Sequence, residues 1–283
     1  MVIQDPAVAA VIQMNSGADR DANLAAAAAL LERAATGGAR LAVLPENFAL
    51  MGQRETDKLQ LAEDDGAGVI QDFLAETARR LDLWIVGGTI PIRAEGDATR
   101  VRAACGVWDA SGRRVARYDK IHLFDVDVPD ARGERYRESA TIEPGEPRAV
   151  VVDTPCGRVG LSVCYDLRFP ELYRALAAAG AQILCVPSAF TERTGRAHWD
   201  TLLRARAVEN LCHVLAANQC GAHPGNRRTW GHSCIVEPWG RIVAACEDVP
   251  EVAVAVLETD AREALRRGFP VLAHRRLGAD ATH

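Results

Sequence analysis

The sequence VGLSVCYDLRFPEL, residues 159–172, places one cysteine, Cys164, between an apolar run and a polar segment that contains Pro170. The apolar residues 158–163 are typical of a buried β-strand, and Pro170 favours a first helical turn because its ring fixes φ near the helical value. A side chain at such a bend projects into a cleft. The backbone N–H of Tyr165 has no strand partner there, so it can stabilise negative charge close to the sulfur. The stretch therefore predicts a nucleophile elbow.

An inert core residue is the alternative interpretation of Cys164. The chain has eight cysteines, and free cysteines are among the most buried residue types. They are irregularly spaced, so we expect reduced thiols rather than disulfides. No C-x-x-C or H-x-x-x-H spacing occurs, and we therefore expect no metal site. We also expect no cofactor.

Length and composition predict one globular domain over residues 1–283. The chain is 48% hydrophobic and 25% charged, and no linker divides it. Its net charge of −5 argues against a general surface for nucleic acid or anionic membranes and favours a small polar substrate. We expect a cytoplasmic protein, because the N-terminus lacks signal-peptide features and no apolar run approaches the ~20 residues of a membrane span.

Strands and helices alternate on both sides of the elbow, which predicts an α/β fold. Two pairs of strands with short turns predict hairpins, so antiparallel pairing is mixed with the alternation. We expect strands at 8–14, 41–44, 83–92, 101–108, 113–118, 149–153, 158–163, 183–186, 213–218, 232–237, 241–246 and 252–258. We expect helices between Asp19 and Gly37, at 69–81, 169–179 and 198–210, and after Thr259, with a long loop at 125–147.

Three charged residues occupy positions that suit catalysis. Glu46 follows strand 41–44 directly, and ligands bind at the carboxyl ends of strands in open α/β folds. Lys120 lies among apolar residues, where an ammonium group needs a carboxylate neighbour. Glu138 lies in the long loop. The alternative role for Glu46 is a helix cap or a loop anion. The alternative for Lys120 is an ordinary surface position.

Six strings in fixed order resemble motifs of the nitrilase (carbon-nitrogen hydrolase) superfamily. They are LPENF at 44–48, YDKIHLFDVDVP at 118–129, YRES at 136–139, GLSVCYDLRFPELYR at 160–174, PSAFTERTGRAHW at 187–199 and WGHSCIVEPWG at 230–240. The similarity covers about residues 8–277. It implies a four-layer αββα sandwich with mixed sheets, and a homodimer or higher homo-oligomer that assembles through helices.

The resemblance implies a role for each residue of the constellation. Glu46 matches the general base of the family, Lys120 its catalytic lysine, Cys164 its nucleophile and Glu138 its second glutamate. The residue types suit hydrolysis of an amide through a cysteine thioester. Lys120 and the N–H of Tyr165 would stabilise the oxyanion.

Residues near the nucleophile resemble one branch of the superfamily in particular. Cys-Tyr-Asp resembles amidases, whereas true nitrilases usually carry Cys-Trp-Glu. The strings CYDLRFPEL, LLRARAVE and AANQCG are most similar to deaminated glutathione amidases, metabolite-repair enzymes that release 2-oxoglutarate and cysteinylglycine. The alternatives are an ω-amidase acting on α-ketoglutaramate, another aliphatic amidase or carbamoylase, and a binding protein without turnover.

Five residues are candidates for substrate binding. Arg168 resembles a residue that binds the α-keto acid end in this branch, and an ion pair with Asp166 or Glu171 is its alternative role. Phe190 and Thr194 match further pocket positions. The second carboxylate of deaminated glutathione, on its glycine, suggests a role for two arginines in a basic loop, Arg227 and Arg228.

A cysteine-histidine pair, as in papain-like enzymes, is the rival mechanism. No histidine string in the chain matches such a family. The histidines that could serve it are His122, His198, His213 and His232.

Overall fold

Two β-sheets pack face to face in the computed structural model, which describes residues 6–128 and 135–277. The seven-stranded sheet has the order β17 (Glu251–Val256), β1 (Val8–Gln13), β2 (Leu41–Val43), β3 (Trp84–Val86), β5 (Asp97–Trp108), β4 (Ile90–Ala94), with β6 (Arg114–Asp119) beside β5. The six-stranded sheet has the order β16 (Ile242–Ala245), β15 (Cys234–Val236), β12 (His213–Ala216), β11 (Ile183–Cys185), β10 (Gly157–Leu161), β9 (Val151–Thr154).

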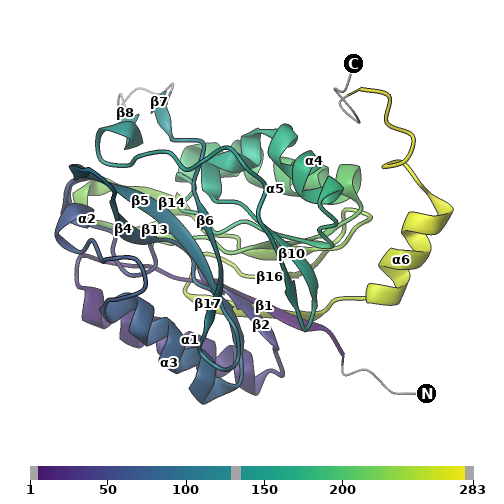
Figure 1. Ribbon diagram of the computed structural model, residues 1–283, viewed down its shortest axis with the longest axis horizontal. Helices are drawn as coiled ribbons and strands as arrows, with labels where there is room; N and C mark the ends of the chain where they lie inside the picture. The colour runs from purple at the N-terminus through teal and green to yellow at the C-terminus, as the bar shows by residue number, and fades with distance from the viewer. Residues whose placement is uncertain (1–5, 129–134, 278–283) are drawn as a thin grey trace.

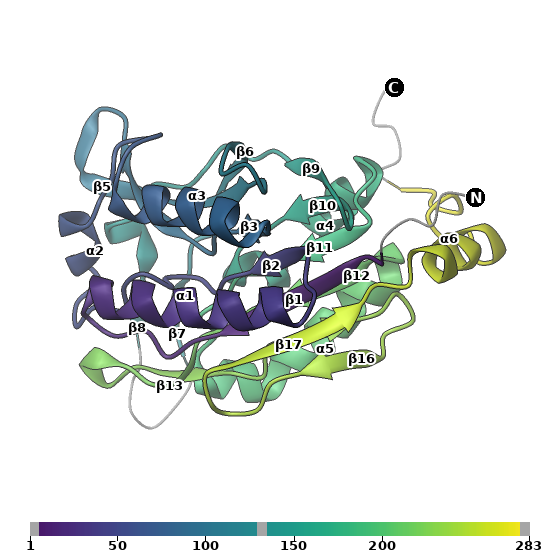
Figure 2. The same cartoon turned by 90° about the horizontal axis from the view of Figure 1, so that it is seen from below.

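Helices cover the outer face of each sheet. The seven-stranded sheet carries α1 (Arg20–Thr36) and α3 (Val69–Leu81), and the six-stranded sheet carries α4 (Pro170–Ala178) and α5 (Glu192–Asn210), as Figures 1 and 2 show. Both sheets mix parallel and antiparallel pairs. The predicted αββα sandwich is therefore confirmed.

The central strands have both faces buried, which explains their continuous apolar sequences. Successive side chains of β1 point to opposite faces. Val11 packs in a cluster with Val159 of β10, whereas Ile12 packs with Leu31 of α1 and Leu74 of α3. The alternation thus joins the two sheets on one side and attaches the helices on the other.

One predicted strand, 83–92, is two strands with a bend between them. Gly88 has a φ of +57°, and a Cβ there would lie 2.1 Å from the carbonyl oxygen of Pro45, so only glycine fits. Beyond the bend, the Thr89 hydroxyl accepts a hydrogen bond of 2.9 Å from the N–H of Asn47. The bend therefore helps to fix the loop that follows β2.

Two further segments differ from the prediction. Helix α5 begins at Glu192 instead of residue 198, because the hydroxyl of Thr191 caps it by accepting from the N–H of Thr194. The expected loop 125–147 contains an antiparallel pair, β7 (Asp125–Asp127) and β8 (Arg135–Arg137), and a short 3₁₀ helix, η1 (Glu138–Ala140). Both expected hairpins, β5–β6 and β15–β16, are present.

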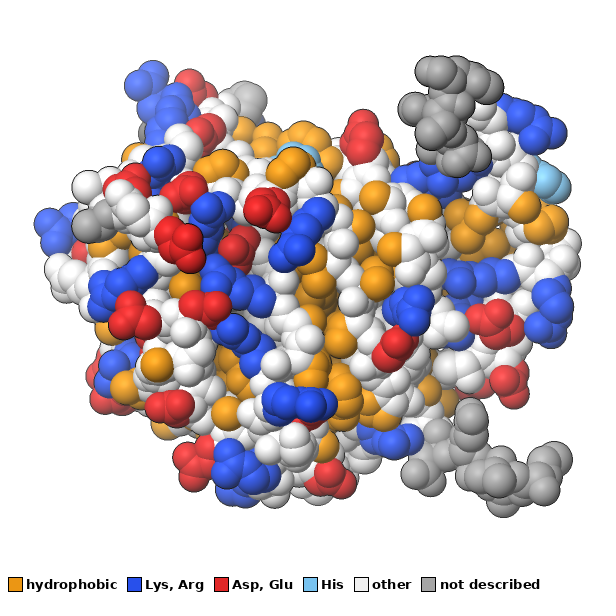
Figure 3. All heavy atoms as spheres, viewed as in Figure 1, with side chains coloured by type: hydrophobic (Ala, Val, Ile, Leu, Met, Phe, Trp, Pro, Cys, Tyr) orange, Lys and Arg blue, Asp and Glu red, His pale blue; other side chains and the backbone are white. Residues whose placement is uncertain are grey.

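The remaining elements lie around this sandwich. A short pair, β13 (Cys220–Ala222) and β14 (Arg228–Trp230), and η3 (Pro224–Asn226) form the basic loop region. Helix α2 (Asp57–Gln60) follows β2, and α6 (Thr259–Gly268) lies beside the sandwich near the C-terminus (Figure 1). Acidic and basic side chains are interspersed over the face in Figure 3. Within the described ranges, the helices are too short or too polar to cross a membrane.

Candidate active site

Cys164 begins a 3₁₀ helix, η2 (Cys164–Arg168), three residues after β10 ends. Its φ is +47°, a left-handed conformation that costs a non-glycine residue about 1–3 kcal/mol. Its backbone N–H donates to the carbonyl of Pro187, 2.8 Å away, in the segment that follows the parallel strand β11. The surrounding structure thus holds the cysteine at the predicted bend between strand and helix.

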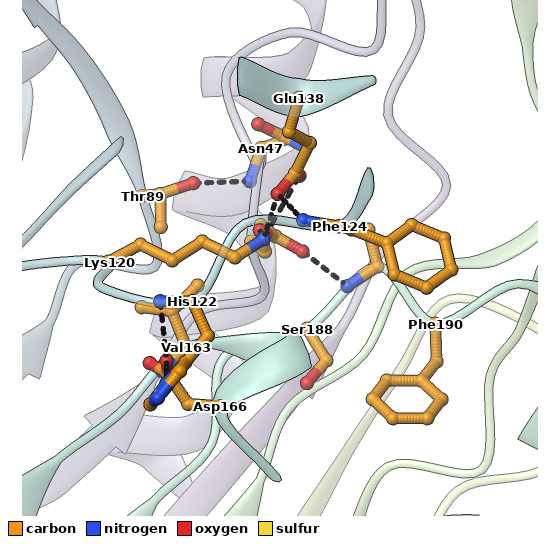
Figure 4. A network of polar contacts seen from close by, with 12 residues as sticks. Asn47, Thr89, Lys120, His122, Phe124, Glu138, Val163, Asp166, Ser188 and Phe190 are labelled. Atoms are coloured by element: carbon orange, nitrogen blue, oxygen red, sulfur yellow. Dashed lines mark hydrogen bonds and ion pairs between the residues drawn. The ribbon is translucent and has the colours of Figure 1, made fainter. Parts of the chain in front are cut away.

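Lys120 connects two glutamates at this place. Its side chain is fully buried, and its Nζ lies 2.8 Å from one oxygen of Glu46 and 2.8 and 2.9 Å from the two oxygens of Glu138. Figure 4 shows Lys120 extended toward Glu138, whose carboxylate also accepts the N–H of Phe124 at 2.8 Å. The other oxygen of Glu46 accepts the N–H of Ala189 at 3.0 Å. Backbone N–H groups therefore hold both carboxylates in contact with one ammonium group.

The charges around Cys164 favour a neutral thiol beside a charged lysine. Burial raises the pKa of the Cys164 thiol well above its ordinary value, the Glu46 carboxylate adds to the rise, and Lys120 acts in the opposite direction. Burial acts to lower the pKa of Lys120, but Glu138 and Glu46 outweigh it and hold that pKa well above its ordinary value. A base must therefore take the thiol proton before the sulfur can attack.

Glu46 is fixed through its backbone as well as its carboxylate. It lies just beyond β2, and Asn47 after it has a φ of +57°. The side chain of Gln219 donates to the carbonyl of Glu46 at 3.1 Å, and Asn47 is held by Thr89. Glu46 is 3% exposed, so its alternative role as a surface loop anion does not apply.

Asp166 joins the elbow to the segment that carries Lys120. One of its oxygens accepts the hydroxyl of Tyr118 at 2.7 Å and the N–H of Val163 at 2.8 Å. The other oxygen lies 2.7 Å from Nδ1 of His122. From the sequence, we expected no role for this buried carboxylate beyond a partner for Arg168. The signal in the sequence was an acidic residue two positions after the cysteine.

A pocket opens above the sulfur. Its lining residues come from five separate segments, and they are Glu46, Asn47, Glu55, Lys58, Phe124, Tyr136, Glu138, Cys164, Tyr165, Arg168, Ala189, Phe190, Thr191, Thr194 and Arg227. The fully buried Lys120 contacts two of these residues, Glu46 and Glu138. The structure therefore brings most of the predicted site residues together in one cavity.

Arg168 lies over the rings of Tyr165 and Phe190, 5.9 and 5.4 Å from their centroids. Its Nη1 lies 3.2 Å from Nδ1 of His198, and within the described chain it forms no ion pair with Asp166 or Glu171. The ion-pair alternative is therefore wrong. The guanidinium remains available to a ligand in the pocket.

The two arginines of the basic loop have different positions. Arg227 lines the pocket and pairs with Glu55. Arg228 pairs with Glu192 at 2.6 Å and lines an outer hollow, and it is not among the residues that line the Cys164 pocket. Glu55 and Lys58 also line the pocket, but they could not be identified from the sequence because they lie in a polar segment without a distinctive pattern.

The four histidines of the rival mechanism are engaged elsewhere. None is among the described residues that line the pocket with Cys164. His122 pairs with Asp166, His198 contacts Arg168, and His232 stacks on Trp230. His213 is buried on β12, and burial lowers its pKa to about 4. The geometry offers Cys164 a glutamate rather than a histidine as its base.

Comparisons with known proteins agree with this geometry. The family model described as "Carbon-nitrogen hydrolase" matches residues 8–267. A Yersinia enterocolitica protein named deaminated glutathione amidase is 43% identical over 267 residues, which cover 94% of this chain and 92% of the relative.

Solved structures give the same result. The crystal structure of the Caenorhabditis elegans NitFhit protein superposes with a TM-score of 0.88 at 40% identity and covers 95% of this chain, which spans 65% of that protein. A Saccharomyces cerevisiae member of branch 10 of the nitrilase superfamily has a TM-score of 0.83 at 31% identity, covering 93% of this chain and 94% of that chain.

Proposed function

Because the chain belongs to the carbon-nitrogen hydrolase family, we propose that it hydrolyses deaminated glutathione through a thioester on Cys164. The products are 2-oxoglutarate and cysteinylglycine. The observation that carries the proposal is the meeting of Glu46, Lys120 and Glu138 at the pocket that Cys164 lines. The name of the close relative from Yersinia supports the choice of substrate.

The first half of the reaction forms the thioester. Glu46 takes the proton of the Cys164 thiol, and the sulfur attacks the amide carbonyl carbon. Lys120 and the N–H of Tyr165, the second residue of η2, stabilise the oxyanion. Loss of one such donor typically raises the barrier by about 3–4 kcal/mol.

The second half releases both products. When the oxyanion collapses, the C–N bond breaks and Glu46 returns its proton to the departing amine of cysteinylglycine. Glu46 then takes a proton from water, whose oxygen attacks the thioester, and Cys164 leaves as a thiol after regaining that proton. Glu138 orients Lys120 and keeps it positively charged throughout.

The pocket also offers contacts for the rest of the substrate. Arg168, held over Phe190, suits the α-keto acid carboxylate because its guanidinium can bind two oxygens at once. Thr194 lines the same pocket and adds a hydroxyl. Arg227 supplies a second cation, whereas Arg228 lies outside this pocket.

An ω-amidase acting on α-ketoglutaramate is the second candidate, since Arg168 would serve its α-keto acid end equally well. Comparing kcat/KM for deaminated glutathione, α-ketoglutaramate and a simple aliphatic amide distinguishes these functions. We expect deaminated glutathione to be preferred. Intact mass after rapid quenching should show an acyl adduct that a Cys164→Ala variant lacks, and a protein without turnover would show no hydrolysis of any of the three.

We also propose a homodimer and a cytoplasmic location. Val208 on α5 and Trp239 are exposed apolar side chains. A Cβ at Gly240, next to Trp239, would lie 2.8 Å from the side chain of Val208, so Val208 and Trp239 belong to one surface. All eight cysteines are free, as in a reducing compartment. Light scattering of the wild type and of a Val208→Glu variant tests the dimer, and a monomeric wild type would contradict it.

A further inference from the structure

Glu55 joins two cations at one side of the pocket. One of its oxygens accepts Nζ of Lys58 at 2.8 Å, and the other accepts Nη2 of Arg227. The side chain of Lys58 is 16% exposed, that of Glu55 is 29% exposed and that of Arg227 is 26% exposed. Water therefore screens their charges less than it would at an open surface. Helix α2 and the basic loop thus meet at the pocket through charged groups.

The part of the Cys164 pocket lined by Lys58, Glu55, Arg227 and Arg168 has an excess of positive charge. Burial acts to raise the pKa of Glu55, but Lys58 and Arg227 outweigh it and lower that pKa to about 2, so the carboxylate is ionised at neutral pH. With Arg168, these side chains amount to three cations and one carboxylate, a net charge of +2. The other two carboxylates that line the pocket, Glu46 and Glu138, are already paired with Lys120. Partly buried cations favour anionic ligands that complete their pairing.

The cations lie at opposite ends of a row of aromatic rings. Arg168 is 5.9 Å from the centroid of Tyr165, whose ring is 5.0 Å from that of Phe124. Phe124 is 5.1 Å from Tyr136, and Arg227 lies 5.7 Å from the centroid of Tyr136. The excess positive charge is therefore divided between two places, which suits a ligand with two separated carboxylates.

We propose that Lys58 and Arg227 form a subsite for a second carboxylate, so that this enzyme selects dianionic amides with one carboxylate on each side of the scissile bond. Glu55 holds the two cations in place. An ammonium group has three N–H donors and a guanidinium five, so each keeps donors for a ligand after pairing with Glu55. The inference rests on the proposed function, in which the glycine of deaminated glutathione provides this carboxylate and Arg168 binds the other end.

Substrates that differ only in that carboxylate test the subsite. Wild type, Lys58→Met and Arg227→Met would be assayed on deaminated glutathione, on its glycinamide form and on α-ketoglutaramate. We expect the wild-type KM to be about 10- to 100-fold higher for the glycinamide, the range for losing a hydrogen bond between charged groups. Each variant should raise KM for deaminated glutathione by a similar factor without changing kcat, and should leave the other two substrates unaffected.

Arg54→Met is the matched control, because this arginine lies near Lys58 in sequence but is 75% exposed and pairs with Asp57. It should behave as wild type on all three substrates. Equal wild-type kcat/KM for the acid and the glycinamide would overturn the subsite and leave the proposed function standing. An equal loss on all three substrates in Lys58→Met would make Lys58 structural. If wild type hydrolyses α-ketoglutaramate but neither glutathione derivative, the proposed function and the subsite both fail.

Discussion

Nζ of Lys120 lies 2.8 Å from an oxygen of Glu46, although the two residues are 74 positions apart in the chain. The same ammonium group contacts both oxygens of Glu138, so one cation is shared by two carboxylates. The trio has a net charge of −1, and this negative charge opposes ionisation of the nearby Cys164. In the proposed mechanism, the thiolate therefore forms only when its proton moves to Glu46, which would couple deprotonation to attack.

Glu46→Gln should abolish most activity with little change in fold. Glutamine has the same shape and can still accept from the N–H of Ala189, but it cannot take the thiol proton. General-base catalysis contributes about 10²- to 10⁴-fold, so we expect kcat to fall by that factor. The acyl adduct on Cys164 should form correspondingly slowly in quenched samples. Wild-type kcat in this variant would rule out Glu46 as the base.

Lys120→Met should destabilise the protein as well as inactivate it. The substitution leaves Glu46 and Glu138 facing each other in a buried site, and loss of one partner of a buried ion pair costs about 3–5 kcal/mol. Chemical denaturation would measure the free energy of unfolding. The double variant Lys120→Met/Glu138→Gln should recover part of that loss while remaining inactive, and no recovery would mean that charge repulsion is not the cause.

Asp166→Asn tests the connection between the elbow and the lysine segment. Asparagine keeps one oxygen, which can still accept from Tyr118 and Val163, but its amide nitrogen then faces the backbone N–H of His122 and cannot accept it. We therefore expect a loss of about 1–3 kcal/mol in the free energy of unfolding and a lower kcat. Asp153→Asn is the matched control, because Asp153 pairs with Arg158 at the surface. Such pairs contribute about 0–1 kcal/mol. Similar effects of the two substitutions would contradict the structural role of Asp166.

The periodicity of apolar residues predicted the strands and helices of an α/β fold, because it records which faces are buried. The four-layer sandwich followed only from the resemblance to the nitrilase superfamily. The same apolar patterns placed Cys164 and Glu46 at the ends of predicted strands, because each residue follows an apolar run in the sequence. The bend at Gly88 could not be predicted, because it depends on a close approach to Pro45, which is distant in sequence. The contact of Lys120 with two glutamates is likewise a product of tertiary structure.

The residues proposed to bind substrate were harder to predict than those proposed to act in catalysis. Arg227 and Arg228 are neighbours in one basic loop, yet only Arg227 lies among the residues that line the pocket. Adjacent residues of the strand β14 region point to different sides, and the sequence does not say which side faces the sulfur. Lys58 was missed because a lysine in a polar segment looks like any surface lysine.

His213 should make folding stability depend on pH. Burial lowers its folded pKa to about 4, with a further contribution from Arg262, whereas an unfolded histidine titrates near 6.5. The unfolded state therefore binds the proton more readily between these values. The stability contributed by neutral His213 is fully present above about pH 6.5 and decreases as pH falls toward 4, by up to about 3 kcal/mol. Denaturation of wild type and His213→Gln between pH 7 and 4.5 measures it. The wild type should lose more stability than the variant over this range, and parallel pH profiles would assign the acid sensitivity to other groups.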